Sequence, residues 1–305
     1  MPTDIHDAIV VGGSWAGLSA AMQLARARRR VLVVDAGRPR NRFAHAAHGF
    51  FGQDGRSPAE ARDAARAQVL AYPTVELCED DAVNAGADGD LFGVELASGA
   101  TARARRIVLA TGVVDDLPDV PGLRERWGVT VLHCPYCHGY EVAGGRLGVL
   151  ATSILSVHQA LLLPDWSGDV TLFTNGVIIP DESERSRLAA RGVRIDARRV
   201  GSVVGDSSAP TALAGLRLEG GEVVPLDALF TSSRTHLASP LAEQLGCAFD
   251  EGPSGLHVRT TPRKETTIPG VFAAGDAALP VHNATFASSD GVMAGIAAHQ
   301  SLALA

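Results

Sequence analysis

The chain has 305 residues, of which 46% are hydrophobic and 20% charged, and its formal net charge is -7. A length above about 250 residues favours two domains over one. The negative charge and the scattered arginines argue against a nucleic-acid-binding surface. No apolar run approaches the roughly 18 residues that a membrane span needs, and no leader pattern opens the chain, so a cytoplasmic location is expected.

The N-terminal segment has the pattern of a strand, a glycine-rich turn, a helix and a second strand. Residues 8–11 are apolar and stop at Gly-Gly-Ser-Trp-Ala-Gly, residues 12–17. Helical spacing follows to about residue 28, and residues 31–34 are apolar again. This order predicts a βαβ unit that opens a parallel sheet. Continuous apolar strands are typical of a sheet that is covered on both faces.

The glycine-rich turn has the spacing of a dinucleotide-binding fingerprint with one departure. Gly12 suits the tight turn and Gly17 suits close packing of the helix, but Ser14 replaces the middle glycine of G-x-G-x-x-G. The helix N-terminus offers N–H groups to a pyrophosphate. Asp35 ends the second strand at about the 20-residue spacing of a ribose-binding acid. A plain strand–turn–helix without a ligand is the alternative interpretation.

The later elements alternate between strands and helices. Pro118 and Pro121 mark a linker, after which a second α/β segment begins. The expected domains are therefore a discontinuous one, 1–116 plus 245–305, and an inserted one, 117–244. The expected strands are 75–77, 91–96, 107–109, 147–151 and 169–174, followed by further strands to about 230, and the expected helices are 52–72, 154–163, 182–191 and 288–302.

Residues 133–141, His-Cys-Pro-Tyr-Cys-His-Gly-Tyr-Glu, carry the strongest chemical signal. Cys134 and Cys137 stand at a predicted helix start, where two intervening residues allow a small disulfide ring and the helix N-terminus favours a thiolate. Half of a zinc site is the alternative. Because Cys78 and Cys247 are isolated, we expect them to be small buried residues and expect no metal.

Two tripeptides, Ala110-Thr111-Gly112 and Ala274-Gly275-Asp276, each follow an expected strand. With the fingerprint and the C-x-x-C, they make the chain resemble low-molecular-weight thioredoxin reductases along essentially its whole length. The variant Cys-Pro-Tyr-Cys-His-Gly-Tyr-Glu is similar to that of the dithiol oxidases that close disulfides in gliotoxin, holomycin and romidepsin. The resemblance implies an α/β fold of two Rossmann-like, three-layer ββα domains of the dinucleotide-binding type, and a homodimer.

FAD is the cofactor that the resemblance implies. Asp276 would bind its ribityl or phosphate end, and Asp290-Gly291 would open a helix beside the flavin. The expected FAD contacts in this sequence are Gly12, Ser14, Gly17, Asp35, Thr111, Gly112, Gly275, Asp276, His48 and Asn283.

His48 and Asn283 each have two interpretations. His48 and the nearby His45 follow the second strand, and His48-Gly49-Phe50 resembles a stretch of the dithiol oxidases. These histidines therefore either contact flavin or substrate or are polar loop residues. Asn283 follows His282 where reductases have a residue beside the flavin ring, and it otherwise caps a helix.

The resemblance also implies roles around the cysteines. Cys134 would exchange with the substrate sulfur, and Cys137 would face the flavin. His138 takes the position of the acid–base Asp of thioredoxin reductases, and an imidazole can move protons near neutral pH. Glu141 is expected to be a solvated acid rather than a residue that orients His138.

The inserted domain lacks the parts of a second nucleotide site. The expected strand at 147–151 runs into Thr-Ser-Ile-Leu-Ser, without a glycine where a phosphate must approach. No arginine follows the strand at 169–174, and Thr231-Ser232-Ser233-Arg234 lacks the glycine that nicotinamide-binding relatives tend to have. An atypical NADPH site is the alternative interpretation.

Together these features predict an enzyme, an FAD-dependent dithiol oxidase. A small-molecule dithiol would reduce the cysteine disulfide, and O2 would reoxidise the flavin to give hydrogen peroxide. One alternative is a reductase of a protein disulfide, fed by NADPH at an atypical site or by ferredoxin. A flavoprotein that senses redox state without catalysis is the other. No nucleic-acid or membrane partner is expected.

Overall fold

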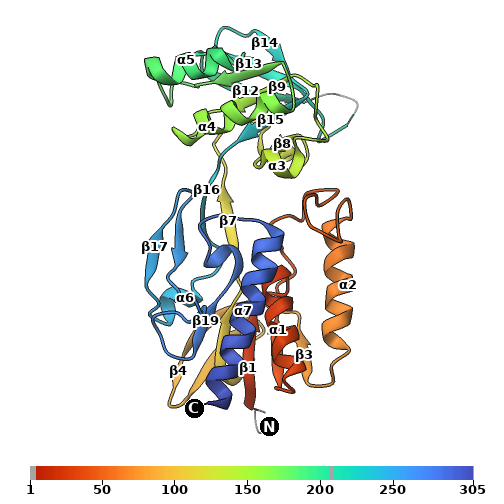
Figure 1. Cartoon of the computed structure of the whole chain (residues 1–305), viewed down its shortest axis with the longest axis vertical. Coiled ribbons are helices and arrows are strands. Elements are labelled where there is room, and N and C mark those ends of the chain that lie inside the picture. The colour runs from red at the N-terminus through yellow and green to blue at the C-terminus, as the bar shows by residue number, and fades with distance from the viewer. Residues whose placement is uncertain (1–4, 206–208, 305) are drawn as a thin grey trace. The chain divides into compact units, whose positions relative to one another are not determined.

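The computed structural model describes residues 5–205 and 209–304, and its contacts divide the chain into two compact units. Within the described residues, unit 1 takes the chain up to Arg42, Pro58–Val114 and Thr235 onward, whereas unit 2 takes Phe43–Ser57 and Asp115–Arg234. Strands β7 (Val113–Asp116) and β16 (Arg234–Leu237) pair where the chain passes between the units (Figure 1).

Unit 1 contains a seven-stranded sheet of order β3-β2-β1-β6-β5-β4, with β19 also paired to β6. The β2–β3, β1–β2, β1–β6 and β6–β19 pairs are parallel, and β4 and β5 add an antiparallel part. The strands are β1 (Ile5–Val11), β2 (Val31–Val34), β3 (Val75–Cys78), β4 (Ala82–Asp88), β5 (Leu91–Leu96), β6 (Thr101–Leu109), β17 (Phe249–Glu251), β18 (Leu256–Val258) and β19 (Val271–Ala273); the helices are α1 (Trp15–Arg26), α2 (Pro58–Leu70), α6 (Leu241–Gln244), the 3-10 turn η3 (Gly275–Ala277) and α7 (Ala284–Ala303).

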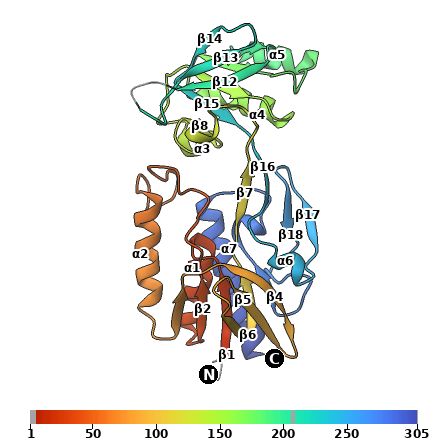
Figure 2. The ribbon, with the colours of Figure 1, turned by 180° about the vertical axis from the view of Figure 1, so that it is seen from behind.

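Alternate residues of β1 face two different hydrophobic cores, as the period of a strand requires. Ala8 and Val10 pack with α1, α2 and α7, whereas Ile9 and Val11 pack with β4, β5 and α6. Figure 2 shows the strands of this sheet from behind. Unit 1 therefore has three layers: helices, the mainly parallel sheet, and a smaller β layer.

Helices α1 and α7 of unit 1 lie side by side (Figures 1 and 2). Their contact is made by backbone, because a Cβ on Gly291 would lie 2.0 Å from the carbonyl oxygen of Ala16 and one on Gly295 would lie 2.5 Å from that of Ala20. Larger residues at these two positions of α7 would force the helices apart. The packing fixes α7 next to the turn that begins α1.

Unit 2 repeats the three-layer plan around a five-stranded parallel sheet of order β11-β10-β9-β15-β8. One core lies under α4 and α5, and the other lies under an antiparallel sheet of β12, β13 and β14. The strands are β8 (Val131–Leu132), β9 (Leu147–Leu150), β10 (Val170–Phe173), β11 (Arg194–Asp196), β12 (Val200–Gly205), β13 (Leu213–Leu218), β14 (Val223–Pro225) and β15 (Ala228–Thr231); the helices are η1 (Arg124–Arg126), α3 (Pro135–His138), α4 (Leu155–Leu162), η2 (Leu163–Asp165) and α5 (Glu182–Ala190).

The predicted α/β class with two dinucleotide-binding-type domains is confirmed by these topologies. The predicted helix at 52–72 is wrong in its first turn and a half. Gly52 and Gly55 have φ of 78° and 74°, which a right-handed helix excludes, and α2 begins only at Pro58.

Across residues 5–205 and 209–304, no helix combines the length and the apolar character that crossing a membrane requires.

Candidate active site

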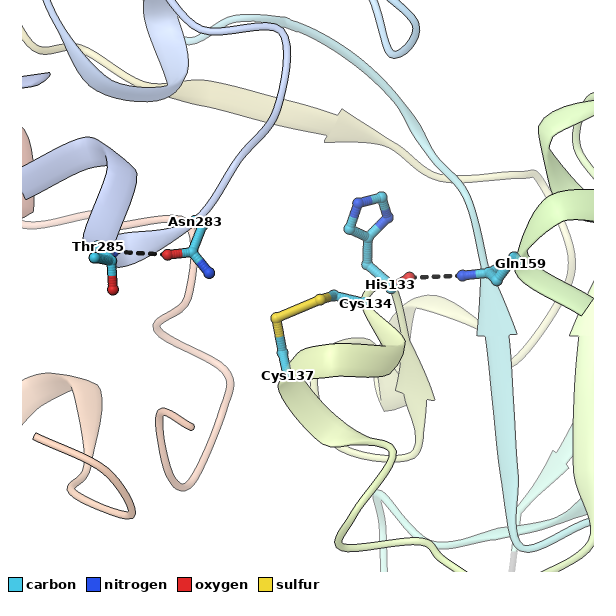
Figure 3. The surroundings of a disulfide bond; sticks show 6 residues. All are labelled: His133, Cys134, Cys137, Gln159, Asn283 and Thr285. Atoms are coloured by element: carbon cyan, nitrogen blue, oxygen red, sulfur yellow. Dashed lines mark hydrogen bonds between the residues drawn. A yellow bond between two sulfur atoms is a disulfide. The ribbon is translucent and has the colours of Figure 1, made fainter. Parts of the chain in front are cut away.

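Cys134 and Cys137 form a disulfide in unit 2, with their Cα atoms 5.3 Å apart (Figure 3). Strand β8 leads to Cys134, which is the N-cap of α3, and the Cys137 N–H donates to the Cys134 carbonyl over 3.2 Å. Helix α3 has only four residues. So short a helix aligns few peptide dipoles, and the thiolate stabilisation expected from a helix N-terminus is correspondingly small.

The buried side chain of Gln159 holds the chain just before this turn. Its Nε2 donates to the carbonyl oxygen of His133 over 2.6 Å (Figure 3). Its Oε1 accepts from the Ser232 hydroxyl over 3.3 Å. The bonds tie the loop that carries Cys134 to α4 and to the residue after β15. Sequence reasoning missed Gln159, because one glutamine in an apolar helix gives no signal of its partners.

His138 is the ionisable side chain that follows Cys137 at the end of α3. Burial lowers the pKa of His138 from its ordinary value of 6.5, the nearby Glu141 carboxylate raises it, and His48 lowers it. The net direction is downward, so the imidazole is neutral at pH 7 and can accept a proton. His138, the next residue after Cys137 in the chain, is therefore in the form that can accept a proton.

Glu141 is exposed, as expected of a solvated acid, and it also contacts a histidine. Its Oε1 lies 3.4 Å from Nε2 of His48, and its side chain is 38% exposed. His48 comes from the segment 43–57, whose contacts place it in unit 2 with the cysteines. The predicted contact of His48 with a flavin stays a prediction. His45, three residues earlier, is exposed.

We call the turn after β1 in unit 1, residues 12–17, the cradle, because its three glycines have no room for a side chain and leave the backbone uncovered. Gly12 has φ of 107°, and a Cβ there would lie 2.2 Å from the carbonyl oxygen of Ala110. A Cβ on Gly13 would lie 2.7 Å from the Asp35 side chain, and one on Gly17 would lie 1.7 Å from the Gly12 carbonyl oxygen. Ser14 is the N-cap of α1, and its side chain makes no capping bond. The first-turn N–H groups of α1 thus face a cradle that fits a pyrophosphate.

The two tripeptides stand at neighbouring strand ends of the same sheet, because β6 pairs with both β1 and β19. Gly112 has φ of 71° and Gly275 has φ of 72°. A Cβ on Gly275 would lie 2.7 Å from that of Ala16 in α1. Thr111, Gly112 and Gly275 therefore line the same end of the sheet as the cradle, where a dinucleotide binds in open α/β folds.

Asp276 and Asn283 both have partners in unit 1. Arg40 Nη1 donates to Asp276 Oδ2 over 3.2 Å and lies 2.7 Å from Nδ1 of His282. Asn283 Oδ1 accepts from the Thr285 N–H over 2.8 Å as the N-cap of α7 (Figure 3). Asn283 thus caps α7 through its side-chain oxygen, which was one of its two interpretations. A flavin contact through its amide nitrogen stays a prediction.

A buried ion pair supports the turn after β19. Lys264 Nζ pairs with Asp290, and their side chains are 13% and 6% exposed. The other carboxylate oxygen of Asp290 accepts from the Gly275 N–H over 3.0 Å. Asp290 was expected to open a helix beside the flavin, but it lies within α7, where its carboxylate fixes the backbone of Gly275.

In the corresponding turn after β9 in unit 2, serine hydroxyl oxygens accept hydrogen bonds from the backbone N–H groups of the turn. The Thr152 N–H donates to Ser156 Oγ over 3.1 Å, and the Leu155 N–H donates to Ser153 Oγ over 3.3 Å. Ile154 and Leu155 expose 55% and 43% of their surface at the start of α4. N–H groups that a phosphate would use are thus already bonded, and two apolar side chains stand beside them.

An arginine does lie beside the turn after β10, although none follows that strand in the sequence. The Arg199 guanidinium carbon is 3.4 Å from the point where a Cβ on Gly176 would lie. Asn175, with φ of 53°, accepts the Val200 N–H over 2.7 Å, which brings the two segments together. No local sequence pattern indicates this cation, because Arg199 reaches the turn from the neighbouring loop.

The remaining cysteines are unpaired, and Cys247 is buried whereas Cys78 is half-buried. Burial raises the pKa of both thiols. In the part of the chain that the structure describes, no group of three or more His, Cys, Asp or Glu side chains is arranged to hold a metal.

The chain has two units of the dinucleotide-binding type and a disulfide within a C-x-x-C turn. This combination defines the class of disulfide oxidoreductases. A family model for the pyridine nucleotide-disulphide oxidoreductases matches residues 6–301, and the chain belongs to this family. Thioredoxin reductase tcpT of Claviceps purpurea is 35% identical over 306 residues, 96% of this chain and 93% of the relative. The predicted resemblance to thioredoxin reductases is confirmed.

Solved structures agree with this relationship. The crystal structure of the oxidoreductase from Agrobacterium tumefaciens is 46% identical, with a TM-score of 0.93 over 99% of each chain. The crystal structure of HlmI is 37% identical, with a TM-score of 0.91 over 99% of this chain and 94% of HlmI.

Proposed function

We propose that this protein is an FAD-dependent dithiol oxidase that works through Cys134 and Cys137. The observation that carries the proposal is the contrast between the two turns of nucleotide-binding type. The turn after β1 is a glycine cradle, whereas the turn after β9 has its N–H groups bonded to Ser153 and Ser156. One dinucleotide site is therefore open and the other is closed, which favours electrons that enter from thiols rather than from NADPH.

The open turn fits FAD. Gly12, Ser14 and Gly17 would hold the pyrophosphate, and Asp35 at the end of β2 would bind a ribose hydroxyl. Thr111, Gly112, Gly275 and Asp276 would complete the site along the same end of the sheet. When bound, FAD supplies a two-electron acceptor that can pass the electrons on to O2, which becomes hydrogen peroxide.

The cysteines carry out the exchange with the substrate. A substrate thiolate attacks Sγ of Cys134, the Cys134–Cys137 bond breaks, and Cys137 leaves as a thiolate. The second substrate thiol then attacks the substrate sulfur of this mixed disulfide, which closes the product disulfide and releases Cys134. The substrate loses two electrons and two protons, and the cysteine pair gains the electrons.

His138 handles the protons of this exchange. Its imidazole is neutral at pH 7 because burial lowers its pKa, so it can take the proton of an attacking thiol and return it to a leaving one. Tyr136 and Tyr140 beside the cysteines are 71% and 83% exposed. These rings offer apolar contact area to an organic dithiol.

Anaerobic reduction of the purified holoprotein tests the proposal. Dithiothreitol should bleach the visible flavin absorbance, NADPH should not, and admission of air should restore the colour with formation of peroxide. Cys134→Ser and Cys137→Ser should each abolish peroxide formation with dithiols, whereas Cys78→Ser should not. Rapid bleaching by NADPH would overturn the proposal in favour of a reductase. In that case Arg199→Gln would test whether the cation beside Gly176 binds the coenzyme.

A further inference from the structure

Arg40, in the loop after β2 of unit 1, contacts two side chains from a distant part of the chain through one nitrogen atom. Its Nη1 lies 3.2 Å from Oδ2 of Asp276 and 2.7 Å from Nδ1 of His282. Asp276 belongs to η3, and His282 comes directly before Asn283, the N-cap of α7. The side chains of Arg40 and Asp276 are 20% and 19% exposed. Arg40 thus joins the two ends of the connection between η3 and α7.

The hydrogen-bonding capacity of a guanidinium decides which tautomer His282 adopts in this contact. Nη1 of an arginine carries two hydrogen atoms, and the group donates hydrogen bonds but accepts none. One hydrogen of Arg40 Nη1 can point at Asp276 and the other at His282. Because Nδ1 of His282 lies 2.7 Å from this donor, it has to be the acceptor and carries no proton. The ring proton is therefore on Nε2.

The backbone beside these side chains is fixed as well. Gly275 precedes Asp276, and a Cβ on Gly275 would lie 2.7 Å from that of Ala16, within the cradle. The Gly275 N–H donates to Asp290 of α7 over 3.0 Å. The turn that carries Asp276 is therefore anchored by its backbone, and Arg40 adds the anchor for its carboxylate. Both act at the end of the sheet where the cradle lies.

We infer that Arg40 is a positioning residue that presents Asp276 and His282 as two complementary ligand-binding groups, a carboxylate acceptor and an Nε2–H donor. The carboxylate can accept a hydrogen bond from a ligand hydroxyl, and the Nε2–H can donate to a ligand oxygen or ring nitrogen. FAD carries both kinds of group, since it has ribityl hydroxyls as well as phosphate and ring carbonyl oxygens. The inference deepens the proposed function, because it takes FAD as the ligand at this end of the sheet.

NMR spectra that correlate ring hydrogens with ring nitrogens locate the proton of His282. They require the full-length protein with 15N-labelled histidine, and His282→Gln identifies the resonances by their loss. In the parent protein, Nε2 of His282 should be protonated and Nδ1 should not, with or without FAD. Arg40→Met removes the donor and should let the ring exchange between its two tautomers. The measurement on the parent protein needs no variant to fold, so it tests the inference by itself.

FAD affinity gives a second readout, measured by fluorescence as FAD is added to the apoprotein. Arg40→Met should bind FAD about two- to tenfold more weakly, the effect of about one lost hydrogen bond. Arg42→Met is the matched control, because Arg42 is an exposed residue of the same loop whose Nη1 donates to the Pro39 carbonyl over 3.0 Å. It should change neither the FAD affinity nor the His282 tautomer.

A proton on Nδ1 of His282 in the parent protein would overturn the inference. Equal FAD affinities of the Arg40→Met and Arg42→Met variants would overturn it as well. Neither measurement involves the cysteines. The inference can therefore fail while the protein still oxidises dithiols, and it can hold if the protein proves to be a reductase.

Discussion

Gly139 lies so close to the indole ring of Trp166 that a larger residue does not fit between them. A Cβ on Gly139 would be 2.9 Å from Cδ2 of Trp166 and 2.6 Å from the carbonyl oxygen of Pro135. Tyr136 packs edge-on against the same indole, with the ring centroids 5.5 Å apart. Trp166 thus packs on Tyr136 and Gly139 and fixes the end of α3 that follows Cys137.

Gly139→Ala should therefore destabilise unit 2 by about 1–3 kcal/mol, the usual cost of an added methyl group in a filled space. The same substitution at Gly168, where no atom lies within 4 Å of an added Cβ, is the control and should change stability by about 0.5 kcal/mol or less. Urea unfolding of the two variants makes the comparison. Equal stability of Gly139→Ala and Gly168→Ala would contradict the contact with Trp166.

Gln159→Leu should cost about 1–3 kcal/mol of folding free energy, because it leaves the His133 carbonyl without its 2.6 Å donor. The variant should also slow the reaction of the cysteine pair with dithiothreitol, since the loop before Cys134 loses its anchor. Gln68→Leu on the exposed face of α2 provides the comparison. Unchanged stability and unchanged thiol exchange in Gln159→Leu would show that the bond is dispensable.

Lys264→Met should be strongly destabilising, by about 3–5 kcal/mol, because it leaves the Asp290 carboxylate buried without its cation. The double variant Lys264→Met/Asp290→Asn should regain part of this loss, since no buried charge remains. Denaturant midpoints of the three proteins measure the difference. Equal losses in the single and double variants would argue against the buried-charge explanation.

The pH dependence of stability has a definite sign at His138. Its pKa in the folded protein is below the unfolded value of 6.5, so the unfolded chain binds more protons in the interval between the two. The contribution of His138 to stability is therefore fully present above pH 6.5 and declines as the pH falls through that interval. His138→Asn should lose less stability than the parent protein over the same interval. Parallel pH profiles of the two proteins would contradict the shift.

Much of the fold follows from patterns within single segments. The apolar runs of β1, β2 and β9 and the spacing of α4 and α5 were visible, because each element buries a continuous or periodic set of side chains. Strand β4 was not predicted, since Ala82–Asp88 contains a glycine, an asparagine and mostly small residues. Its strand character comes from pairing with β5, which is a tertiary effect.

The candidate site likewise has features that local sequence patterns predict and features that they do not. The C-x-x-C spacing indicated a disulfide-forming pair, and the disulfide between Cys134 and Cys137 is present. The contact of His48 with Glu141, and that of Arg199 with the turn at Gly176, join residues that are distant along the chain. No local pattern specifies such contacts, because they depend on how loops from different strand ends meet.

Lys264 is the only lysine in the sequence, and its amine is held in the buried pair with Asp290. Reagents that acylate lysine can therefore modify a side chain only when the contact between Lys264 and α7 opens. The rate of acylation at this residue would report how often the interior of unit 1 is exposed. Coupling to a surface through lysine would, for the same reason, select molecules that are already partly unfolded.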